Sequence, residues 1–149
     1  MDQYITDEGC PLVANFLKTH SHFQEVDLKS NKITPNGFLK LCEGLREMKR
    51  LSVLAVNNNY LGQDNRGLEG LYSLMVNMDL QIKELYLRNN EINDDNLKPL
   101  LAILQESKSL CQLDLRMNKI TTIGGEKILK VLDSASWPVQ VLITGNKVK

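Results

Sequence analysis

The chain has 149 residues, enough for one domain with a buried core. Its 18 lysines and arginines balance its 18 aspartates and glutamates, so no net positive charge draws it to nucleic acid or to anionic lipid. No apolar run approaches the roughly 20 residues that span a bilayer, and we expect neither a nucleic-acid nor a membrane partner.

Three cysteines, Cys10, Cys42 and Cys111, are widely spaced and form no Cys-x-x-Cys pair. We expect free thiols that fill apolar space in a reducing compartment. The N-terminal stretch MDQYITDEGC also lacks the basic start and apolar core of a secretory signal. These features predict a cytoplasmic, intracellular protein.

The chain opens with a helical pattern. In TDEGCPLVANFLK one apolar stripe is formed by Val13, Phe16 and Leu17. We therefore expect a helix over residues 7–18. The following turn carries His20 and His22, but no cysteine or carboxylate cluster is spaced to complete a metal site, so we predict a solvated turn and no metal.

A string of the form apolar-x-x-apolar-x-apolar-x-x-Asn-x-apolar recurs five times. Its asparagines are Asn31, Asn59, Asn90, Asn118 and Asn146, at intervals of 28, 31, 28 and 28 residues. A fixed period of this size indicates a stacked repeat array. We predict a single domain over 1–149, with a partial N-terminal repeat (1–22, Gln3 in the asparagine position), repeats that start at 23, 51, 82 and 110, and a partial C-terminal repeat (138–149).

The hydrophobic period changes within each repeat. The first part alternates, as in Val26 and Leu28, which predicts a strand with one buried face. The second part has helical spacing, with stripes at Phe38, Leu41, Leu45 and Met48, at Leu97, Leu100, Leu101 and Leu104, and at Ile128, Leu129 and Leu132. Thr34 and Pro35 fit the N-cap and first turn of the first of these helices.

The second repeat is three residues longer than the others. We expect the extra residues in the polar turn GQDNR (62–66) and in the exit MDLQ (78–81).

The asparagine of each string lies where the strand ends and the chain turns into the core. A buried amide at this point needs hydrogen-bond partners. We therefore expect a structural asparagine ladder, in which each amide bonds backbone groups of its own turn and of the neighbouring repeat.

This pattern resembles the leucine-rich repeat family, specifically its ribonuclease-inhibitor-like type. The shared residues are the five strings, together with Gly9, Gly37 and Gly124 four places after the last apolar residue of a string. Parallel strands lie about 4.8 Å apart whereas helices need about 10 Å, so such a stack bends. The expected fold is an α/β solenoid, a curved horseshoe segment with parallel strands on the concave face and helices on the convex face. The resemblance implies binding to another protein, of unknown identity.

Alternate strand positions point outward and form the candidate partner-binding surface. We expect it to consist of Tyr86, Arg88, Arg116, Tyr60, Asn57, Asp27, Lys29, Asp114 and Met117. Aromatic and arginine side chains dominate interface hot spots, so the contact centre is placed at Tyr86, Arg88, Arg116 and Tyr60. In the competing interpretation, the charged residues merely pair with neighbours across strands.

No residue pattern predicts catalysis. The sequence has no Gly-x-Ser-x-Gly element and no cysteine–histidine arrangement, and the Gly124–Gly125 pair belongs to no phosphate loop. We predict a protein that is not an enzyme and binds no cofactor.

Three functions stay open. The first is a module that binds a partner protein on its concave face, in which Tyr86→Ala with Arg116→Glu abolishes binding and leaves thermal stability near wild type. The second is a small-GTPase regulator, because the repeat type looks similar to that of Ran GTPase-activating protein. The third is a fragment or sensor portion of a larger leucine-rich repeat protein, such as an innate-immune receptor or a bacterial effector.

No helical pattern follows the C-terminal string, which leaves three interpretations of this end. Either Trp137 and Leu142 cover it as a minimal cap, or the chain is part of a longer array, or the strand edge pairs with another chain in self-association.

Overall fold

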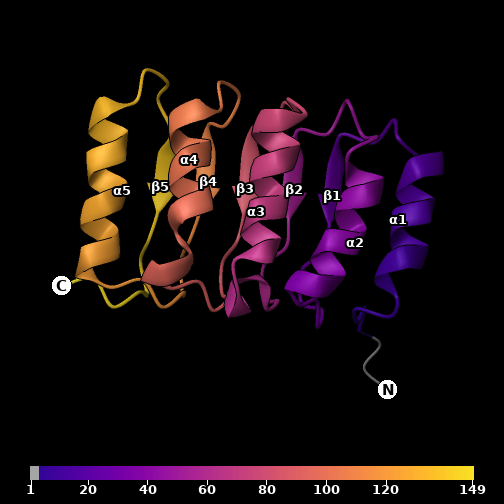
Figure 1. Ribbon diagram of the computed structural model, residues 1–149, viewed down its shortest axis with the longest axis horizontal. Helices are drawn as coiled ribbons and strands as arrows, with labels where there is room; N and C mark the ends of the chain where they lie inside the picture. Colours follow the sequence, from indigo (N-terminus) through magenta and orange to yellow (C-terminus); the bar gives the residue numbers. More distant parts are fainter. Residues whose placement is uncertain (1–3) are drawn as a thin grey trace.

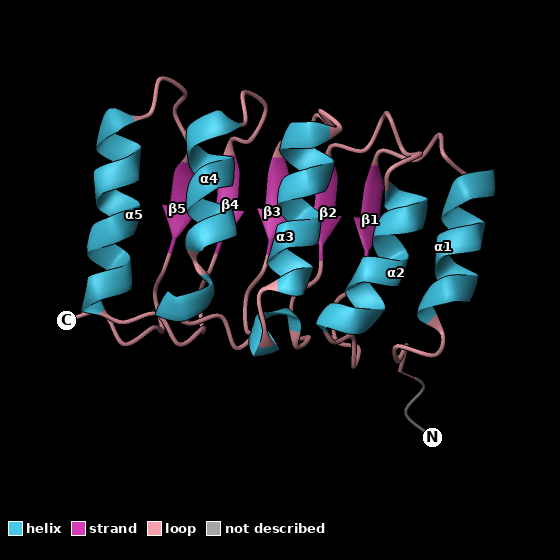
Figure 2. Ribbon diagram, in the orientation of Figure 1, coloured by secondary structure: helices cyan, strands magenta, loops and turns pink. Residues whose placement is uncertain are grey.

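The computed structural model describes residues 4–149, which form two layers (Figure 1). One layer is a parallel sheet in the order β1 (Glu25–Asp27), β2 (Val53–Ala55), β3 (Glu84–Tyr86), β4 (Gln112–Asp114) and β5 (Gln140–Leu142). The other layer consists of α1 (Cys10–Thr19), α2 (Pro35–Leu45), α3 (Arg66–Tyr72), α4 (Lys98–Glu106) and α5 (Thr122–Ser134). Figure 2 shows the helices side by side on one face of the sheet. The expected α/β leucine-rich repeat solenoid, with strands on the concave and helices on the convex side, is confirmed.

The strands align by repeat position. Val26, Leu54, Leu85, Leu113 and Val141 occupy the same register on successive strands. These side chains point into the space between sheet and helices, where the first four are buried and Val141 is partly buried. The register follows from the repeat, because equal spacing puts the same apolar residue at the same height in every strand.

The central helices bury the predicted stripes. Phe38, Leu41, Leu45 and Met48 are fully buried and Leu97, Leu100 and Leu104 nearly so, whereas Leu101 is only partly buried. Ridges at i, i+3, i+4 and i+7 face the sheet, so hydrophobic burial stabilises α2 and α4 at their predicted positions.

The end helices differ from the prediction. Phe16 of α1 is 50% exposed and Leu129 of α5 is 60% exposed, whereas Cys10 and Ala14 are buried with Leu17. α1 begins at Cys10 rather than residue 7 and turns its small residues toward α2. The reason is close helix packing: a Cβ on Gly44 of α2 would lie 2.4 Å from the Ala14 carbonyl oxygen, which leaves no room for a phenylalanine.

The three extra residues of the second repeat are divided between a turn and a wide helical turn. Leu68 is buried nine residues after Asn59, whereas Phe38 is buried seven residues after Asn31. Two extra residues therefore precede α3, as expected for the GQDNR turn. The third is accommodated by a π-helix, η2 (Ser73–Asn77), because a π-helical turn contains more residues than an α-helical turn. The expectation that it lies in the MDLQ exit is wrong.

The C-terminal end is more open than the centre of the stack. The Trp137 Nε1–H donates to the Leu110 carbonyl at 2.9 Å, and Leu142 is half-buried.

No helix within residues 4–149 is long and apolar enough to cross a membrane. Gln3 lies outside the described residues, and the predicted repeat and domain boundaries stay predictions.

Candidate functional site

The asparagines of the repeated strings connect neighbouring repeats. The Asn118 side chain is buried; its Oδ1 accepts from the Asn90 and Ile92 amides at 2.9 and 3.0 Å, and its Nδ2 donates to the Leu87 and Leu115 carbonyls, both at 3.0 Å. Asn59 bonds the Ile33 amide and the Leu28 and Val56 carbonyls in the same way. Each amide thus joins the end of its own strand to the preceding repeat.

The two ends of this asparagine row keep the pattern with less burial. Asn31 Oδ1 accepts from the Ile5 amide at 2.8 Å, and Asn146 Oδ1 accepts from the Ile120 amide at 3.0 Å. Both side chains are only half-buried. In the described part of the chain, no buried side-chain nitrogen or oxygen lacks a partner.

The centre of the concave face is formed by β3 and β4. Tyr86 pairs with Asp114 in the register of the sheet and is half-exposed. Its hydroxyl donates to Glu84 Oε2 at 2.5 Å, two residues earlier on the same face. The hydrogen bond to this carboxylate, aided by burial, raises the pKa of Tyr86. The ring is therefore fixed in place, and it stays uncharged at neutral pH.

Asp114 and Arg116 form a fixed ion pair beside Tyr86. Arg116 donates from Nε and Nη2 to the two Asp114 oxygens at 2.9 and 2.8 Å, and its backbone amide donates to Oδ1 at 3.0 Å. The Asp114 side chain is 1% exposed. Burial alone would raise the pKa of Asp114, but the Arg116 hydrogen bonds outweigh it and keep the pKa below its usual value.

This pairing corrects two sequence-based expectations. Charged residues pair within one strand, at positions i and i+2, rather than across strands. Alternate residues of a strand share a face, so long side chains reach one another. Arg116→Glu would also place a second carboxylate beside a buried one, so we now expect this change to lower stability rather than to leave it near wild type.

On β1, Asp27 and Lys29 repeat the arrangement at the surface. The Lys29 Nζ lies 2.9 Å from Asp27 Oδ2. The pKa of Asp27 is lowered: burial opposes ionisation, but hydrogen bonds from Lys29 outweigh it. These residues line a shallow hollow of about 330 Å³ with Glu25, Val53, Ala55, Asn57, Glu84 and Tyr86.

Asn57 and Arg88 lie between this hollow and Arg116. Asn57 is half-buried, and its Oδ1 accepts from the Arg88 backbone amide at 2.8 Å. The Arg88 side chain is exposed and forms no ion pair with the described residues. Within residues 4–149, Arg88 is thus the arginine of this face that is open to a ligand, whereas Arg116 is engaged.

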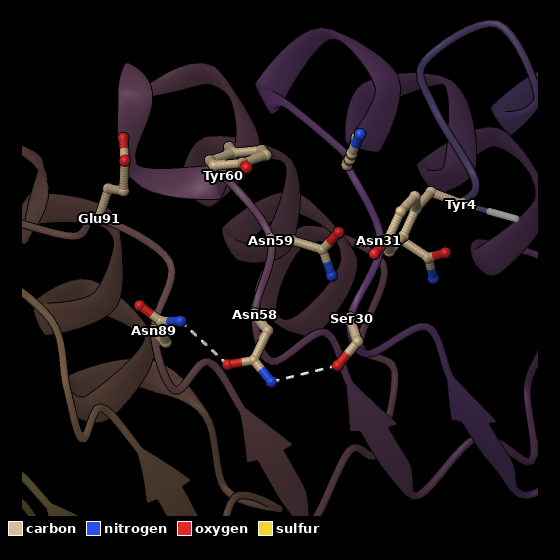
Figure 3. Close-up of a pocket in the computed structure, with 9 residues that line it drawn as sticks. Tyr4, Ser30, Asn31, Asn58, Asn59, Tyr60, Asn89 and Glu91 are labelled. Carbon is tan, nitrogen blue, oxygen red and sulfur yellow. Dashed lines mark hydrogen bonds between the residues drawn. The ribbon is translucent and has the colours of Figure 1, made fainter. Parts of the chain in front are cut away.

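Tyr60 and Met117 lie beyond the strand ends, apart from Tyr86. Tyr60 lines a second hollow, the rim hollow, of about 320 Å³ with Tyr4, Ser30, Asn31, Lys32, Asn58, Asn59, Asn89 and Glu91 (Figure 3). In it Asn58 Nδ2 donates to Ser30 Oγ, and Asn89 Nδ2 donates to Asn58 Oδ1. The structure therefore groups Tyr86, Arg88 and Arg116 but not Tyr60.

A family model described as Leucine Rich repeat matches residues 19–42 and 106–129. The chain is 27% identical over 144 residues to mouse NACHT, LRR and PYD domains-containing protein 14, and 27% identical over 147 residues to mouse ribonuclease inhibitor. The chain has the leucine-rich repeat fold, and its sequence is similar to the ribonuclease-inhibitor-like type of that family. Each match covers 96% of this leucine-rich repeat chain but only 14% and 31% of the relative.

A third relative is the Rho GTPase-activating protein gacW of Dictyostelium discoideum, 21% identical over 144 residues. That match covers 94% of the leucine-rich repeat chain and 13% of the relative. The chain therefore spans less than a third of each of these three proteins.

Hydrogen bonds between an aspartate of one repeat and a threonine of the next were not predicted from the sequence. Asp7 Oδ1 accepts from the Thr34 amide at 2.9 Å, and Asp94 Oδ1 accepts from the Thr121 amide at 2.9 Å. In both pairs the threonine hydroxyl also donates to the aspartate. Thr34 occupies the N-cap position of α2 but makes no side-chain cap bond. The equal spacing of 27 residues was the available signal in this leucine-rich repeat sequence.

The two histidines lie at the N-terminal end of the stack. His20 stacks on Phe16 with 4.0 Å between ring centroids, and His22 lies 4.5 Å from the Phe23 ring. In the part of the chain that the structure describes, no group of three or more histidine, cysteine or acidic residues is arranged to hold a metal ion.

Proposed function

We propose that this leucine-rich repeat protein is an interaction module that binds another protein through its concave face, and that its role is binding rather than catalysis. The observation that carries the proposal is the cluster on β3 and β4, where half-exposed Tyr86 lies beside exposed Arg88 and the Asp114–Arg116 pair. Tyrosine and arginine side chains that are already ordered contribute much of the energy of protein interfaces.

The charges of the concave face suggest what the partner presents. Glu25, Asp27 and Glu84 surround the hollow over β1–β3, where Lys29 is the basic residue and is paired with Asp27. Arg88 lies toward β4. A complementary partner surface carries a basic group opposite the hollow and an acidic group opposite Arg88, since such an arrangement aligns the two proteins.

The other predicted contact residues have supporting roles in this proposal. Asn57, Asp27 and Lys29 border the hollow, Asp114 holds Arg116, and Tyr60 and Met117 contact the partner only if it reaches the strand ends. Met117 has a backbone φ of 59°, as do Ser30, Asn58 and Asn89 to within a few degrees (57°, 56° and 53°). The left-handed backbone conformation therefore recurs at this position of the repeats, and the Met117 side chain is 51% exposed.

The two alternative functions each have one supporting observation. The match to the Rho GTPase-activating protein gacW favours regulation of a small GTPase. The match to mouse NACHT, LRR and PYD domains-containing protein 14 favours a sensor portion of a larger protein. A GTP hydrolysis assay with purified Rho and Ran family GTPases separates the first alternative from binding alone, because only a regulator accelerates turnover.

We further propose that the protein works in a reducing, intracellular compartment. Cys10, Cys42 and Cys111 are unpaired within the described residues. Burial raises the pKa of Cys42 to about 12 and, with the nearby Asp7 charge, that of Cys10 to about 11. The thiols of Cys10 and Cys42 are therefore protonated and unreactive at neutral pH, which agrees with a packing role for these two. Cys111 is exposed, so the expectation that it fills apolar space is wrong.

Affinity purification from the native host tests the binding proposal. The bait is the full chain, compared with Tyr86→Ala/Arg88→Glu and with Lys130→Glu on the exposed side of α5. We expect a protein that is retained by wild type and Lys130→Glu and lost with the double variant, while the melting temperatures of all three agree within a few degrees. Equal retention by all three baits would show that the concave centre does not bind it.

A further inference from the structure

The convex side carries a groove between α3 and α4, here called the helix groove. It has a volume of about 360 Å³ and is lined mainly by Glu69, Tyr72, Lys98, Pro99, Ala102 and Glu106. Glu69 and Tyr72 are spaced i, i+3 on α3, while Lys98, Ala102 and Glu106 are spaced i, i+4, i+8 on α4. α3 and α4 are neighbours in the helical layer (Figure 1), and residues of both helices line the groove.

Small residues on the two sides of α3 explain why the groove is open. Gly70 faces α2, where a Cβ would lie 3.1 Å from Leu39 Cδ2 and 3.2 Å from Cys42 Sγ. The missing side chain lets α3 pack closely against α2. On the other side of α3, the small Ala102 leaves space between α3 and α4. The π-helix η2 that continues α3 is a feature often found beside functional sites.

The groove wall holds carboxylates without a cationic partner. The Tyr72 hydroxyl donates to Glu106 Oε2 at 3.0 Å, which holds this carboxylate near the edge of the ring. Within residues 4–149, neither Glu69 nor Glu106 forms an ion pair, and neither does Lys98 at the opposite end of α4. The floor is apolar at Pro99 and Ala102.

We propose that the helix groove binds a segment of a partner protein through a lysine or arginine side chain of that segment. The cationic group lies between Glu69 and Glu106 and against the Tyr72 ring, and the apolar residue beside it covers Pro99 and Ala102. Two carboxylates and an aromatic face attract a cation, because the Coulomb attraction of the carboxylates and the cation–π attraction of the ring add together. Lys98 excludes the cation from the other end and so sets the direction of the bound segment.

This site is separate from the concave face and does not rest on it. The lining residues belong to the helices, whereas the proposed contact centre of Tyr86 and Arg88 belongs to the strand layer. Either proposal can fail while the other holds.

Titration with small peptides, followed by amide NMR of the full chain, tests the proposal. The probes are the acetylated dipeptide amides leucyl-arginine, leucyl-lysine and leucyl-citrulline, where citrulline matches arginine in shape but carries no charge. We expect shifts confined to α3 and α4, with dissociation constants on the order of millimolar and the citrulline probe at least about fivefold weaker. A preference between arginine and lysine identifies the cation.

Four variants test the residue roles. Glu69→Gln and Glu106→Gln are each expected to weaken arginine-probe binding about two- to fivefold, and Lys98→Gln to strengthen it by a similar factor, because a competing cation is removed. Glu126→Gln on the exposed side of α5 is the matched control and is expected to bind like wild type. Equal binding of citrulline, shifts elsewhere, no shifts at all, or an unchanged affinity in all of the groove variants would overturn the proposal.

Discussion

Asn118 provides the sharpest test of how the repeats are held together. Its side chain accepts from two backbone amides and donates to three carbonyls, and it is almost completely buried. Asn118→Ala leaves the Asn90 and Ile92 amides without their acceptor. Each buried unsatisfied donor costs about 1–3 kcal/mol, so we expect a loss of about 3–5 kcal/mol in the free energy of unfolding, a large part of a typical total of about 5–15 kcal/mol.

Two further variants calibrate this value. Asn146→Ala removes a half-buried amide at the end of the row, and we expect a loss of about 1–2 kcal/mol, since water replaces some of the bonds. Asn36→Ala changes an exposed asparagine in the first turn of α2 and is expected to stay within about 0.5 kcal/mol of wild type.

Urea unfolding measures all three, by far-UV circular dichroism and by the fluorescence of Trp137, the single tryptophan. Coincident transitions with equal m values allow the free energies to be compared. If Asn118→Ala costs no more than Asn36→Ala, the asparagine row does not stabilise the stack.

Three other changes test the packing and the ion pair. Gly44→Ala places a methyl group 2.4 Å from the Ala14 carbonyl, so we expect a melting-point loss that corresponds to about 1–3 kcal/mol, whereas Gly9→Ala, with its nearest contact at 3.6 Å, is neutral. The pKa of Asp114 is lowered in the folded state, so the ionised carboxylate stabilises the fold above pH about 4, and this stabilisation is lost as the pH falls below that value. Urea unfolding between pH 2 and 7 is therefore expected to show a smaller drop in the free energy of unfolding at acid pH for Asp114→Asn than for wild type. Arg116→Gln leaves the buried carboxylate without its cation and is expected to cost about 1–3 kcal/mol at pH 7 by urea unfolding, with little difference from wild type near pH 2.

The architecture was predictable because it depends on residue spacing. Equal intervals place Leu54, Leu85 and Leu113 in one register, and any chain with that spacing must stack its strands in parallel with the helices on one side. The orientation of the end helices was not predictable in this way. Phe16 and Leu129 have neighbours on one side only, so apolar spacing could not tell which of two faces packs inward.

The surface was predictable as a list of positions but not as a set of contacts. The alternation of strand residues brings Tyr86 and Arg116 to the same face. That Arg116 is engaged by Asp114 while Arg88 is open depends on side-chain geometry, which spacing does not encode. The helix groove was not predicted from the sequence. Its width depends on the distance between α3 and α4, which is set by Gly70 and Ala102, two residues that lie in different repeats.

Tyrosine footprinting tests whether the protein recognises a partner through its concave face. Three tyrosines each report one surface: Tyr86 the concave face, Tyr60 the rim hollow and Tyr72 the helix groove. Hydroxyl-radical modification of the protein, alone and with the captured partner, is read by mass spectrometry at each tyrosine. We expect the partner to protect Tyr86. Unchanged modification of Tyr86, with protection of Tyr60 or Tyr72 instead, would contradict it.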